Sequence, residues 1–397
     1  MPRLDRAVNI ADLRRMAGRR LPRPIFDYID GGADDEVALA NNAGAFGRYE
    51  ILPDTLVDVS AIRTETRLFG QPAAWPLVLA PTGLTRMFHP DAEAAVARAA
   101  ARHGLPYALS TMGTTRIEDW ARNFAGPRVF QIYVFKDRGL TTEFVQRCKA
   151  AGVHGLALTV DTPVAGNRER DRRNGLSLPP RLTLSSLMSF ALHPGWSLPA
   201  LTGSKFDLAN VSHRVDVLAG QSMSLFDYIG AQFDRSVTWK DVEWLAAEWG
   251  GPLSIKGVMT PEDARRAVAS GASGVMLSNH GGRQLDTAPA PVDQIAGVRD
   301  ALGDSVEIIC DGGVRRGSDV VKALALGADG CSIGRPYLYG LAAGGEAGVD
   351  RALTLLRSEF ELTMALMGVN DVERLERRHV RRSPLAGEGG PKGRMRG

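Results

Sequence analysis

Short apolar runs alternate with amphipathic stretches along most of the chain, from about residue 76 onward. Eight of these runs are apolar at successive positions, as strands buried on both faces are. They lie at 77–80, 107–109, 129–134, 156–160, 253–256, 274–277, 306–310 and 330–333. Helical spacing predicts helices between them, at 91–103, 138–151, 239–249, 261–270, 292–302 and 318–326. Such strands pair in parallel through right-handed crossovers, so the pattern predicts an α/β fold, a (β/α)8 TIM barrel.

An internal repeat supports the barrel. The segments 147–155, 266–274 and 322–330 each contain a helix end, a glycine that stops the helix and a second glycine that opens a strand. The stopping glycines are Gly152, Gly271 and Gly327, and the opening glycines are Gly155, Gly274 and Gly330. Glycine closes helices in the left-handed conformation, so the repeat marks equivalent βα units.

The repeat also relates strand ends to one another. Its offset places Thr159, Ser278 and Gly334 at matching positions and pairs Asp161 with His280. The C-terminal ends of barrel strands share one rim, where such barrels carry their chemistry. We therefore expect Asp161 and His280 to face one another across a single site.

Three regions lie outside the barrel, which we place at 76–370. Residues 1–75 predict a helical N-terminal segment, in which Tyr28 lies just before an Asp-Gly-Gly helix stop. A long insertion follows the fourth strand at about 165–237, charged at 167–173 and apolar at 182–196. Residues 371–397 are basic and rich in glycine and proline, and we expect a loosely ordered tail.

Composition narrows the class of protein. The 397 residues are 44% hydrophobic and 23% charged, which is ample for a large core. A net charge of +3 does not indicate nucleic-acid binding. Cys148, Cys310 and Cys331 have no CxxC spacing, so we expect buried reduced thiols and no metal site. The sequence shows no secretory signal and no stretch apolar enough to span a bilayer, which predicts a cytoplasmic protein, with peripheral contact at the membrane's inner face still open.

The stretch 278–286 reads SNHGGRQLD and directly follows a predicted strand. His280 supplies a base, and Arg283 supplies an anion clamp three positions later, at the same end of the barrel. The plain alternative is a polar turn in which asparagine and glycine reverse the chain. If this stretch is part of a catalytic site, Asp161 is the carboxylate that orients His280, because a neighbouring carboxylate helps an imidazole accept a proton.

Arg168 is the second candidate for the anion clamp, because two arginines hold a planar carboxylate bidentately and present its α-carbon to a base. Against this, a charge run such as the one around Arg168 is usually a solvated face. Tyr28 and Tyr133 are candidates for hydrogen bonds to a substrate carboxylate or hydroxyl, although tyrosines near element ends are usually half-buried packing.

Glycine-rich loops follow the seventh and eighth predicted strands, where barrels of this kind bind phosphate. Their candidate residues are Asp311, Gly312, Gly313 and Arg315 in the first loop and Gly334 and Arg335 in the second. Glycines let backbone N–H groups approach an anion, arginines add forked bonds, and the carboxylate suits a sugar or ribityl hydroxyl. Two ordinary helix-capping turns are the alternative, but the matching positions of both loops favour phosphate.

Small, hydroxyl and amide residues end the first four predicted strands, and a lysine ends the fifth. They are Pro81, Thr82, Gly83, Ser110, Gln131, Thr159 and Lys256. Such a set fits the edge of a flat heteroaromatic ring held by hydrogen bonds, and a lysine stabilises the negative charge of a reduced flavin. Each residue is ordinary alone, and a lysine is more often on the surface.

Together these residues resemble the family of FMN-dependent L-2-hydroxy acid dehydrogenases and oxidases. The resemblance runs from Tyr28 to about Gly368 and includes SNHGGRQLD at 278–286, APTGL at 80–84, VDTPVAGNRERD at 160–171 and LHPGW at 192–196. Within the family the chain is most similar to the membrane-associated (S)-mandelate and L-lactate dehydrogenases. The resemblance implies FMN as cofactor, oxidation of a mandelate-like or lactate-like L-2-hydroxy acid to the 2-keto acid, and a homo-oligomer, a tetramer or larger.

The resemblance also implies roles for single residues. His280 matches the catalytic base and Asp161 its partner, with Lys256 near flavin N1 and O2. The substrate residues it implies are Arg168, Arg283, Tyr28 and Tyr133. The remaining cofactor contacts it implies are Pro81, Thr82, Gly83, Ser110, Gln131, Thr159 and Ser278 for the ring, and Asp311, Gly313, Arg315, Gly334 and Arg335 for the ribityl and phosphate groups.

Two features bear on the electron acceptor and the substrate. Gly83 stands where many oxidases carry alanine and resembles the quinone-linked members, which favours a dehydrogenase over an O2-using oxidase that makes hydrogen peroxide. The apolar stretch 182–201 aligns with the segment through which those members contact the membrane, and it has an interfacial composition. An active-site lid is the alternative. Met87 and Phe88 suit an aromatic or long substrate side chain.

Two other classes of protein stay open at this point. A barrel that isomerises a phosphorylated metabolite would share the phosphate loops, but it has no need for two arginines beside a His–Asp pair. A non-catalytic binding protein would keep the barrel without the complete set of polar strand ends. Hydride and carbanion routes for the substrate hydrogen are both compatible with these residue types.

Overall fold

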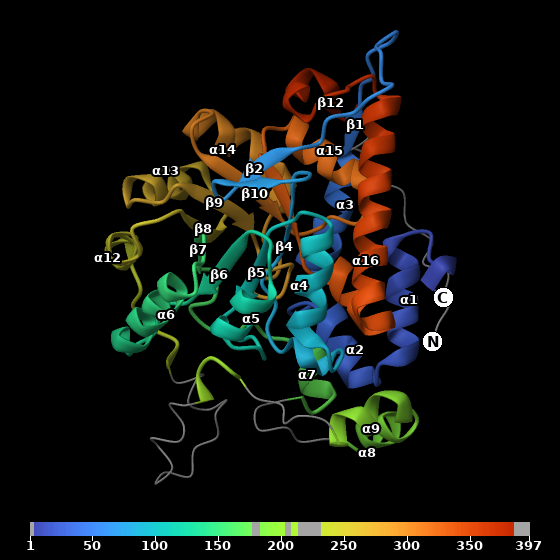
Figure 1. Ribbon diagram of the computed structural model, residues 1–397, viewed down its shortest axis with the longest axis vertical. Helices are drawn as coiled ribbons and strands as arrows, with labels where there is room; N and C mark the ends of the chain where they lie inside the picture. The colour runs from blue at the N-terminus through green and yellow to red at the C-terminus, as the bar shows by residue number, and fades with distance from the viewer. Residues whose placement is uncertain (1–3, 177–182, 203–207, 213–231, 385–397) are drawn as a thin grey trace.

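A closed barrel of eight parallel strands forms the centre of the computed structural model, which describes residues 4–176, 183–202, 208–212 and 232–384. The barrel strands are β4 (Leu77–Leu79), β5 (Tyr107–Ser110), β6 (Arg128–Ile132), β7 (Gly155–Thr159), β8 (Leu253–Val258), β9 (Gly274–Ser278), β10 (Glu307–Asp311) and β11 (Gly330–Ile333). β11 pairs with β4 and closes the ring. The predicted (β/α)8 barrel is confirmed (Figure 1).

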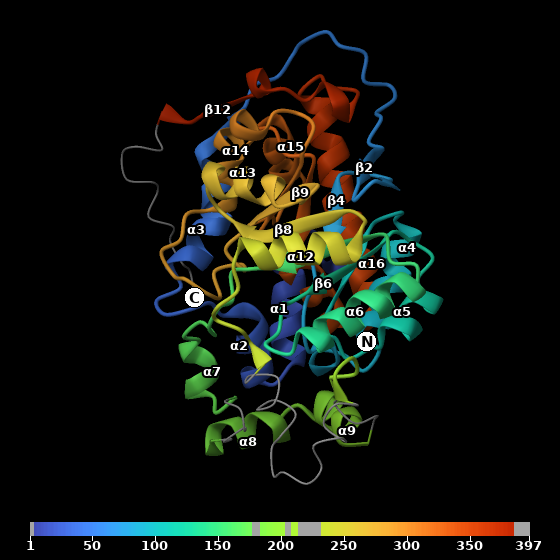
Figure 2. The same ribbon diagram turned by 90° about the vertical axis from the view of Figure 1, so that its left-hand side faces the viewer.

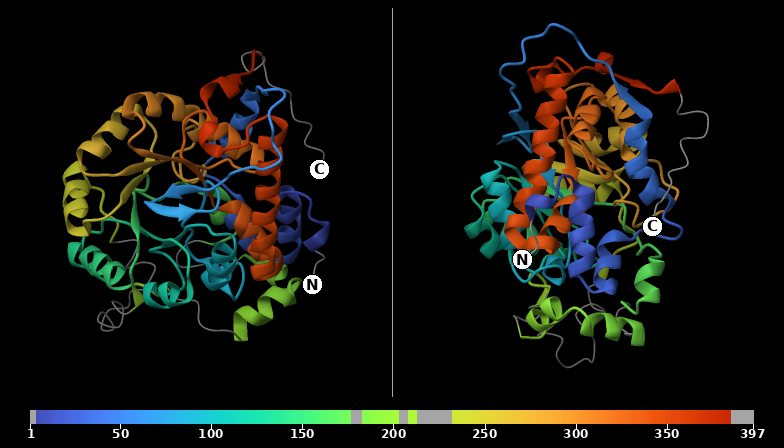
Figure 3. Two further views of the ribbon diagram at one scale, coloured as in Figure 1. Left: turned by 45° about the horizontal axis from the view of Figure 1, so that its top comes forward. Right: turned by 90° about the vertical axis from the view of Figure 1, so that its right-hand side faces the viewer.

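Helices surround the strands, as the view closer to the barrel axis shows (Figure 3, left). They are α4 (Ala92–Arg102), α5 (Ile117–Asn123), α6 (Arg138–Ala150), α12 (Trp239–Trp249), α13 (Pro261–Ala269), α14 (Ile295–Leu302), α15 (Gly317–Ala325) and α16 (Arg335–Leu366). All six predicted helices are present. The pattern missed α5, which is short, and α16, whose glycines weaken helical propensity and which is interrupted at Gly344 and Gly345.

The barrel interior is layered from apolar to polar. Its middle is an apolar cluster of Val78, Ala108, Val129, Ala157, Met276 and Ile309 with residues of a hairpin below. Side chains two positions further along a strand point the same way. At that level the interior side chains are Ala80, Ser110, Gln131, Thr159 and Asp311, and they line a cavity. Four of these five strands, β5, β6, β7 and β10, therefore change from apolar to polar side chains at the C-terminal end.

A hairpin of β2 (Thr66–Leu68) and β3 (Gln71–Ala73) closes the other end of the barrel. Its buried Phe69 donates its backbone N–H to Glu307, with 2.7 Å between N and Oε1. A Cβ on Gly155 would lie 2.9 Å from Phe69, and one on Gly330 would lie 2.9 Å from Leu68. These glycines of the repeat therefore make room for the hairpin, whereas the sequence had indicated only that they open strands.

The N-terminal segment packs beside the barrel through α1 (Ile10–Arg20), α2 (Arg23–Asp30) and α3 (Val37–Ala45). α2 ends at Asp30 as predicted, with Gly31 as its C-cap. The segment also contains strand β1 (Tyr49–Ile51), which pairs antiparallel with β12 (Val380–Arg382). Strand pairing at 380–382 thus orders part of the segment 371–397 that the sequence predicts as a loosely ordered tail, and 385–397 lie outside the described residues. Short 3-10 helices lie at Leu4–Arg6, Phe46–Arg48, Thr85–Met87, Pro291–Gln294, Val372–Arg374 and Arg377–His379.

The insertion after β7 contains α7 (Glu169–Arg173), α8 (Leu184–Ala191) and α9 (Pro194–Thr202). Figure 2 shows these three helices together at one end of the molecule, with α2 next to α7. No helix in the described part of the chain is long and apolar enough to cross a membrane. Residue 182, in the predicted apolar stretch, lies outside the described residues.

Candidate active site

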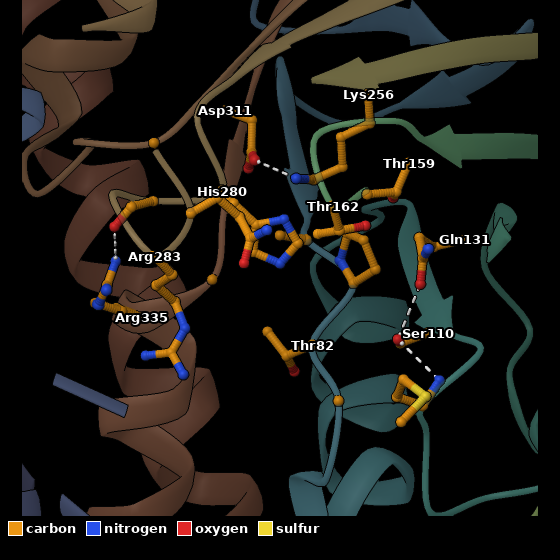
Figure 4. A pocket seen from close by; sticks show the side chains of 18 of the residues that line it. Thr82, Ser110, Gln131, Thr159, Thr162, Lys256, His280, Arg283, Asp311 and Arg335 are labelled. Atoms are coloured by element: carbon orange, nitrogen blue, oxygen red, sulfur yellow. Dashed lines mark hydrogen bonds and ion pairs between the residues drawn. The ribbon is translucent and has the colours of Figure 1, made fainter. Parts of the chain in front are cut away.

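A cavity of about 880 Å³ opens at the C-terminal ends of the barrel strands, and Figure 4 shows it from close by. This volume is in the range of small-molecule and cofactor sites. Eighteen predicted site residues line it: Tyr28, Pro81, Thr82, Gly83, Ser110, Gln131, Tyr133, Thr159, Arg168, Lys256, His280, Arg283, Asp311, Gly312, Gly313, Arg315, Gly334 and Arg335. The other two do not line the cavity but contact residues that do: Asp161 contacts His280, and Ser278 contacts Lys256. The sequence-based set is therefore brought together in one place.

His280 and Asp161 form the central pair. The Nδ1 atom of His280 lies 2.8 Å from Oδ1 of Asp161. His280 has a φ of 59°, an unusual backbone conformation that concentrates at functional sites when the surroundings enforce it. Here Asn279 enforces it, since its side chain exchanges two hydrogen bonds of 2.7 Å with Asn42 and accepts one from the backbone N–H of Gly282. The turn therefore aims the imidazole at the cavity.

The protonation states of this pair suit a base. Burial lowers the pKa of His280 below its usual value, although Asp161 acts in the opposite direction. Burial alone would raise the pKa of Asp161, but His280 and Lys256 lower it overall, so this carboxylate is ionised. An ionised carboxylate only accepts hydrogen bonds, so Nδ1 of His280 is the donor. The lone pair of a neutral His280 is then on Nε2.

Lys256 is a buried cation beside the pair. Its Nζ donates to Ser278 Oγ at 2.9 Å and lies 3.2 Å from Asp311 Oδ2 and 3.8 Å from Asp161 Oδ2. Ser278 in turn donates to Asp311 at 2.7 Å. Burial alone would lower the pKa of Lys256, but Asp311 and Asp161 raise it above its usual value. Strand β8 therefore places a fixed positive charge at the floor of the cavity.

Two arginines meet at the other side of the cavity, as would suit an anion. Burial, together with the neighbouring Arg168, lowers the pKa of Arg283 to about 9. The guanidinium of Arg283 lies over the ring of Tyr28, 4.9 Å from its centroid. The Nε of Arg168 is buried and has no hydrogen-bond partner among the described residues. Arg168 lowers the pKa of Arg283 by charge repulsion, and a carboxylate bound between the two guanidinium groups would relieve that repulsion.

The remaining wall has the polar atoms that a flavin ring needs. Gln131 Nε2, Thr159 Oγ1 and Ser332 Oγ are buried and have no hydrogen-bond partner in the described part of the chain. Buried polar groups are nearly always paired, so these atoms indicate a missing ligand with donors and acceptors on its edge. Ser110 donates to Gln131 Oε1 at 3.0 Å and so orients that amide. The residues present fit FMN.

The phosphate end is built from a loop and a helix start. Gly312 and Gly313 line the cavity with φ values of 119° and 88°, a backbone conformation that favours glycine. Gly334 is the N-cap of α16, and helix N-termini attract anions. Arg315 lines the same region and uses one guanidinium nitrogen on the carbonyl of Val314.

Arg335 differs from expectation. Its Nε, Nη1 and Nη2 donate to the carbonyls of Ile29, Gly281 and Gly31 at 2.9, 2.9 and 2.8 Å. An arginine has five N–H donors, so at most two remain for a phosphate. The sequence predicts a forked bond from Arg335 to a phosphate. In the structure most of the guanidinium donors bind backbone carbonyls instead, two of them in the N-terminal segment, so Arg335 has a largely structural role.

Several cavity residues were not anticipated. Phe233, late in the insertion, meets the ring of Tyr133 edge-on with 4.9 Å between centroids, and no sequence signal points to it. Gln284 lies inside SNHGGRQLD and donates to the carbonyls of Asp161 and Val164 at 3.1 and 2.7 Å. Met112 follows Ser110 and lies against Gly83. Phe233 could be found only from the structure. Gln284 and Met112 are sequence neighbours of predicted site residues.

These features define a flavin-binding barrel with a His–Asp pair and an anion site. The chain matches the family described as FMN-dependent dehydrogenase over residues 17–382, and it belongs to that family. A putative L-lactate dehydrogenase of Mycobacterium tuberculosis is 44% identical, with 95% of this chain and 90% of the relative covered. Glycolate oxidase of Spinacia oleracea is 42% identical, with 94% and 95% covered.

Solved structures agree with these relatives. The monotopic membrane protein (S)-mandelate dehydrogenase superposes with a TM-score of 0.88 at 37% identity, covering 95% of this chain and all of that one. A mandelate oxidase with benzoyl-formic acid has a TM-score of 0.80 at 36% identity, covering 94% and 98%. The protein is therefore an FMN-dependent oxidoreductase that oxidises 2-hydroxy acids.

Proposed function

We propose that His280 is the base that removes a proton from the 2-hydroxy acid, with Asp161 holding the ring and balancing the charge it gains. The observation that carries this role is the 2.8 Å contact between His280 Nδ1 and Asp161 Oδ1 behind a cavity-facing imidazole. Oxidation of the alcohol to the ketone releases two electrons and two protons. FMN, when bound, would supply the acceptor of both electrons and of one proton, and His280 takes the other proton at Nε2.

Arg168 and Arg283 bind the substrate carboxylate in this proposal. The proximity of their charges and the unpaired Nε of Arg168 support it. Tyr28 and Tyr133 then lie close enough to the bound acid, as cavity residues, to hydrogen-bond its carboxylate or hydroxyl. Burial raises the pKa of Tyr133 to about 12, so its hydroxyl stays a donor across the working pH range. The substrate is thus held at its carboxylate while its α-carbon faces His280.

The cofactor role falls to the strand ends. Pro81, Thr82, Gly83, Ser110, Gln131, Thr159 and Ser278 would surround the ring, and Asp311, Gly312, Gly313, Arg315, Gly334 and Arg335 the ribityl and phosphate groups. Lys256 would stabilise negative charge on the reduced ring, because it stays protonated in a buried position. The barrel at 76–370 thus binds the cofactor, whereas residues 1–75 supply Tyr28 and the insertion supplies Arg168.

The electron acceptor in this proposal is a membrane quinone, with O2 as the competing acceptor. Gly83 supports it, because it resembles the glycine of the quinone-linked members, and alanine here would place its Cβ 2.9 Å from the Cβ of Met112 and so require Met112 to shift. The match to (S)-mandelate dehydrogenase, a monotopic membrane protein, supports it further. Glycolate oxidases among the relatives represent the O2-using alternative.

Helices α8 and α9 are the proposed membrane contact, at the inner face of the cell membrane. Their exposed apolar residues are Leu184, Leu187, Met188, Leu192, Leu198 and Leu201. The indole N–H of Trp196 donates to the carbonyl of Met87 at 2.8 Å, which fixes α9 next to Phe88 in the cavity wall. A quinone dissolved in the membrane would then reach the cavity from this side. We also expect a homo-oligomer, a tetramer or larger, as the resemblance implies.

The substrate in this proposal is a mandelate-like or lactate-like L-2-hydroxy acid. Phe88, which stacks on Tyr28 with 6.3 Å between centroids, gives the cavity an aromatic wall that suits mandelate. An anaerobic titration of the yellow protein with (S)-mandelate and with L-lactate tests the proposal. We expect flavin bleaching by one acid and recovery much faster with a quinone analogue than with air. A flavin that neither acid bleaches would overturn the substrate class, and faster recovery in air would establish an oxidase.

A further inference from the structure

The C-terminal end of α2 holds two arginines of the cavity. Arg283 Nη1 donates to the carbonyls of Tyr28 and Gly31 at 2.6 and 3.0 Å. Arg335 donates to the carbonyls of Ile29 and Gly31 at 2.9 and 2.8 Å. The last carbonyls of a helix have no partner within it and lie at its negative end, so they bind cations well. The position of this helix end therefore sets where both guanidinium groups lie.

Asp30, the last residue of α2, ties this helix end to three other elements. Arg14 of α1 donates to both carboxylate oxygens, with Nε and Nη2 at 2.5 and 2.7 Å. Tyr339 of α16 donates its hydroxyl at 2.8 Å, and Arg170 of α7 contributes Nη1 at 3.3 Å. Asp30 is only 5% exposed, and although burial opposes ionisation, Arg14 lowers its pKa below the usual value. It is therefore a buried, charged anchor.

The same carboxylate reaches the second substrate arginine. Arg170 pairs with both Asp30 and Glu36, and Asn174 at the end of α7 donates to Asp27 at 2.8 Å. Both ends of α7 are thus fixed to α2 and the turn that follows it. Arg168 is the N-cap of α7, two residues before Arg170. Its backbone position therefore depends on the contact between α7 and α2.

We propose that Asp30 is a positioning residue for the arginine pair that binds the substrate. It fixes the end of α2, which holds Arg283, and it binds Arg170, which fixes the segment that carries Arg168. Asp30 is not among the residues that line the cavity, so it acts through others. The inference rests on the proposed role of Arg168 and Arg283 in binding the carboxylate. Small displacements of such clamps weaken binding strongly.

Asp30→Asn tests this role, because it keeps the shape of the side chain and removes its charge. We expect the Kd of the 2-keto acid product, measured by perturbation of the bound flavin's absorbance, to rise about tenfold together with KM. The value of kcat should stay within about threefold and FMN should stay bound, because the His280–Asp161 pair and most of the proposed FMN contacts lie at the ends of barrel strands that Asp30 does not contact.

Asp371→Asn is the matched control. Asp371 is equally buried, at 6% exposure, and pairs with Arg63, but it lies in the C-terminal segment far from the cavity. It should lower Tm to a similar extent and leave Kd and KM unchanged. If Asp30→Asn also lowers Tm without changing Kd and KM, Asp30 is merely structural and the proposal is overturned.

A second variant keeps the proposal testable if Asp30→Asn does not fold. Tyr339→Phe removes one of the bonds to Asp30, and we expect a smaller but measurable rise in Kd, whereas an unchanged Kd would overturn the proposal. Arg168→Met and Arg283→Met separate the two levels of the argument: if neither weakens acid binding, the proposed carboxylate site is wrong. A crystal structure of Asp30→Asn then decides the positioning role, by whether Arg283 keeps its bonds to Tyr28 and Gly31.

Discussion

His280 Nδ1 lies 2.8 Å from Asp161 Oδ1, although 119 positions separate the two residues in the chain. The barrel brings them together because β7 and β9 end at the same rim, with β8 between them. An ionised Asp161 fixes which nitrogen of His280 carries the proton, and in the proposed role of His280 it would stabilise the imidazolium that forms when the substrate proton is taken up. The pair therefore gives a direct prediction.

Asp161→Asn should slow anaerobic flavin reduction by the substrate by about 10²- to 10⁴-fold, the usual contribution of a positioned base. The amide keeps the size of the side chain, and it removes the charge that orients and stabilises the imidazolium. Stopped-flow absorbance of the bound flavin measures the rate. His280→Ala should lose at least as much while FMN stays bound. Reduction at nearly the wild-type rate in either variant would refute the assigned roles.

The pH profile follows from the same pair. His280 must be neutral to accept a proton, so kcat/KM should rise with pH through the pKa of His280 and then stay level until Arg283 loses its charge near pH 9. Burial lowers this pKa below 6.5, so the midpoint of the rise should lie below pH 6.5. The charge of Asp161 raises the pKa of His280 and so opposes the effect of burial. The midpoint of the rise in the Asp161→Asn variant should therefore lie at a still lower pH. A midpoint above pH 6.5 in the wild-type enzyme would contradict this.

The site could be predicted from the sequence where its residues sit at equivalent points of a repeating unit. Thr159, Ser278 and Gly334 were related by one offset, and the structure places all three at the same rim. Local polarity at strand ends is a property of the chain itself, so it is visible before folding. The closed barrel followed from strand count and the handedness of crossovers.

What the sequence did not reveal depends on contacts between distant segments. The donors of Arg335 are taken by carbonyls of Ile29 and Gly31, about three hundred positions away. No local pattern predicts such competition for a guanidinium group. The pairing of β1 with β12, which orders the start of the tail, is equally non-local. Phe233 belongs to the insertion, whose lack of periodicity left its side chains without any predicted position.

Gly83→Ala tests the proposed preference for a quinone. The added methyl group would lie 2.9 Å from the Cβ of Met112, so Met112 would have to shift. We expect reoxidation of the reduced flavin by air to become faster relative to reoxidation by a quinone analogue. Gly44→Ala is the control, because a Cβ there meets nothing within 4 Å. An unchanged ratio in Gly83→Ala would remove this residue from the argument for a dehydrogenase.

The membrane contact is tested by Leu184→Asp combined with Leu187→Asp. Leu184 is 86% exposed on α8, and burial of two leucines in a bilayer interface is worth roughly 3–6 kcal/mol. The wild-type protein should sediment with phospholipid vesicles and the double variant should stay in solution, with turnover on a soluble acceptor unchanged. Leu366→Asp, an exposed leucine at the end of α16, is the control and should still sediment. Equal sedimentation of all three would contradict the proposed contact.

Glu307 makes the closure of the barrel sensitive to pH. Its carboxylate accepts the backbone N–H of Phe69 in the hairpin, and burial raises its pKa to about 7. The folded protein therefore holds a proton there that the unfolded chain releases near the ordinary value of 4.5. A raised carboxyl pKa favours the folded state fully below pH 4.5, and this advantage is lost as pH rises towards 7.

Glu307→Gln should remove the loss of folding stability that occurs as pH rises towards 7. The amide oxygen still accepts from Phe69, and no charge is buried, so the variant should gain up to about 3 kcal/mol of stability relative to wild type at pH 8 and little at pH 4.5. Thermal unfolding of both proteins across this pH range measures the difference. Asp300→Asn, at an exposed carboxylate on α14, should shift Tm equally little at both pH values. A difference between Glu307→Gln and wild type that did not grow with pH would mean that Glu307 titrates normally and that the hairpin closes the barrel by packing alone.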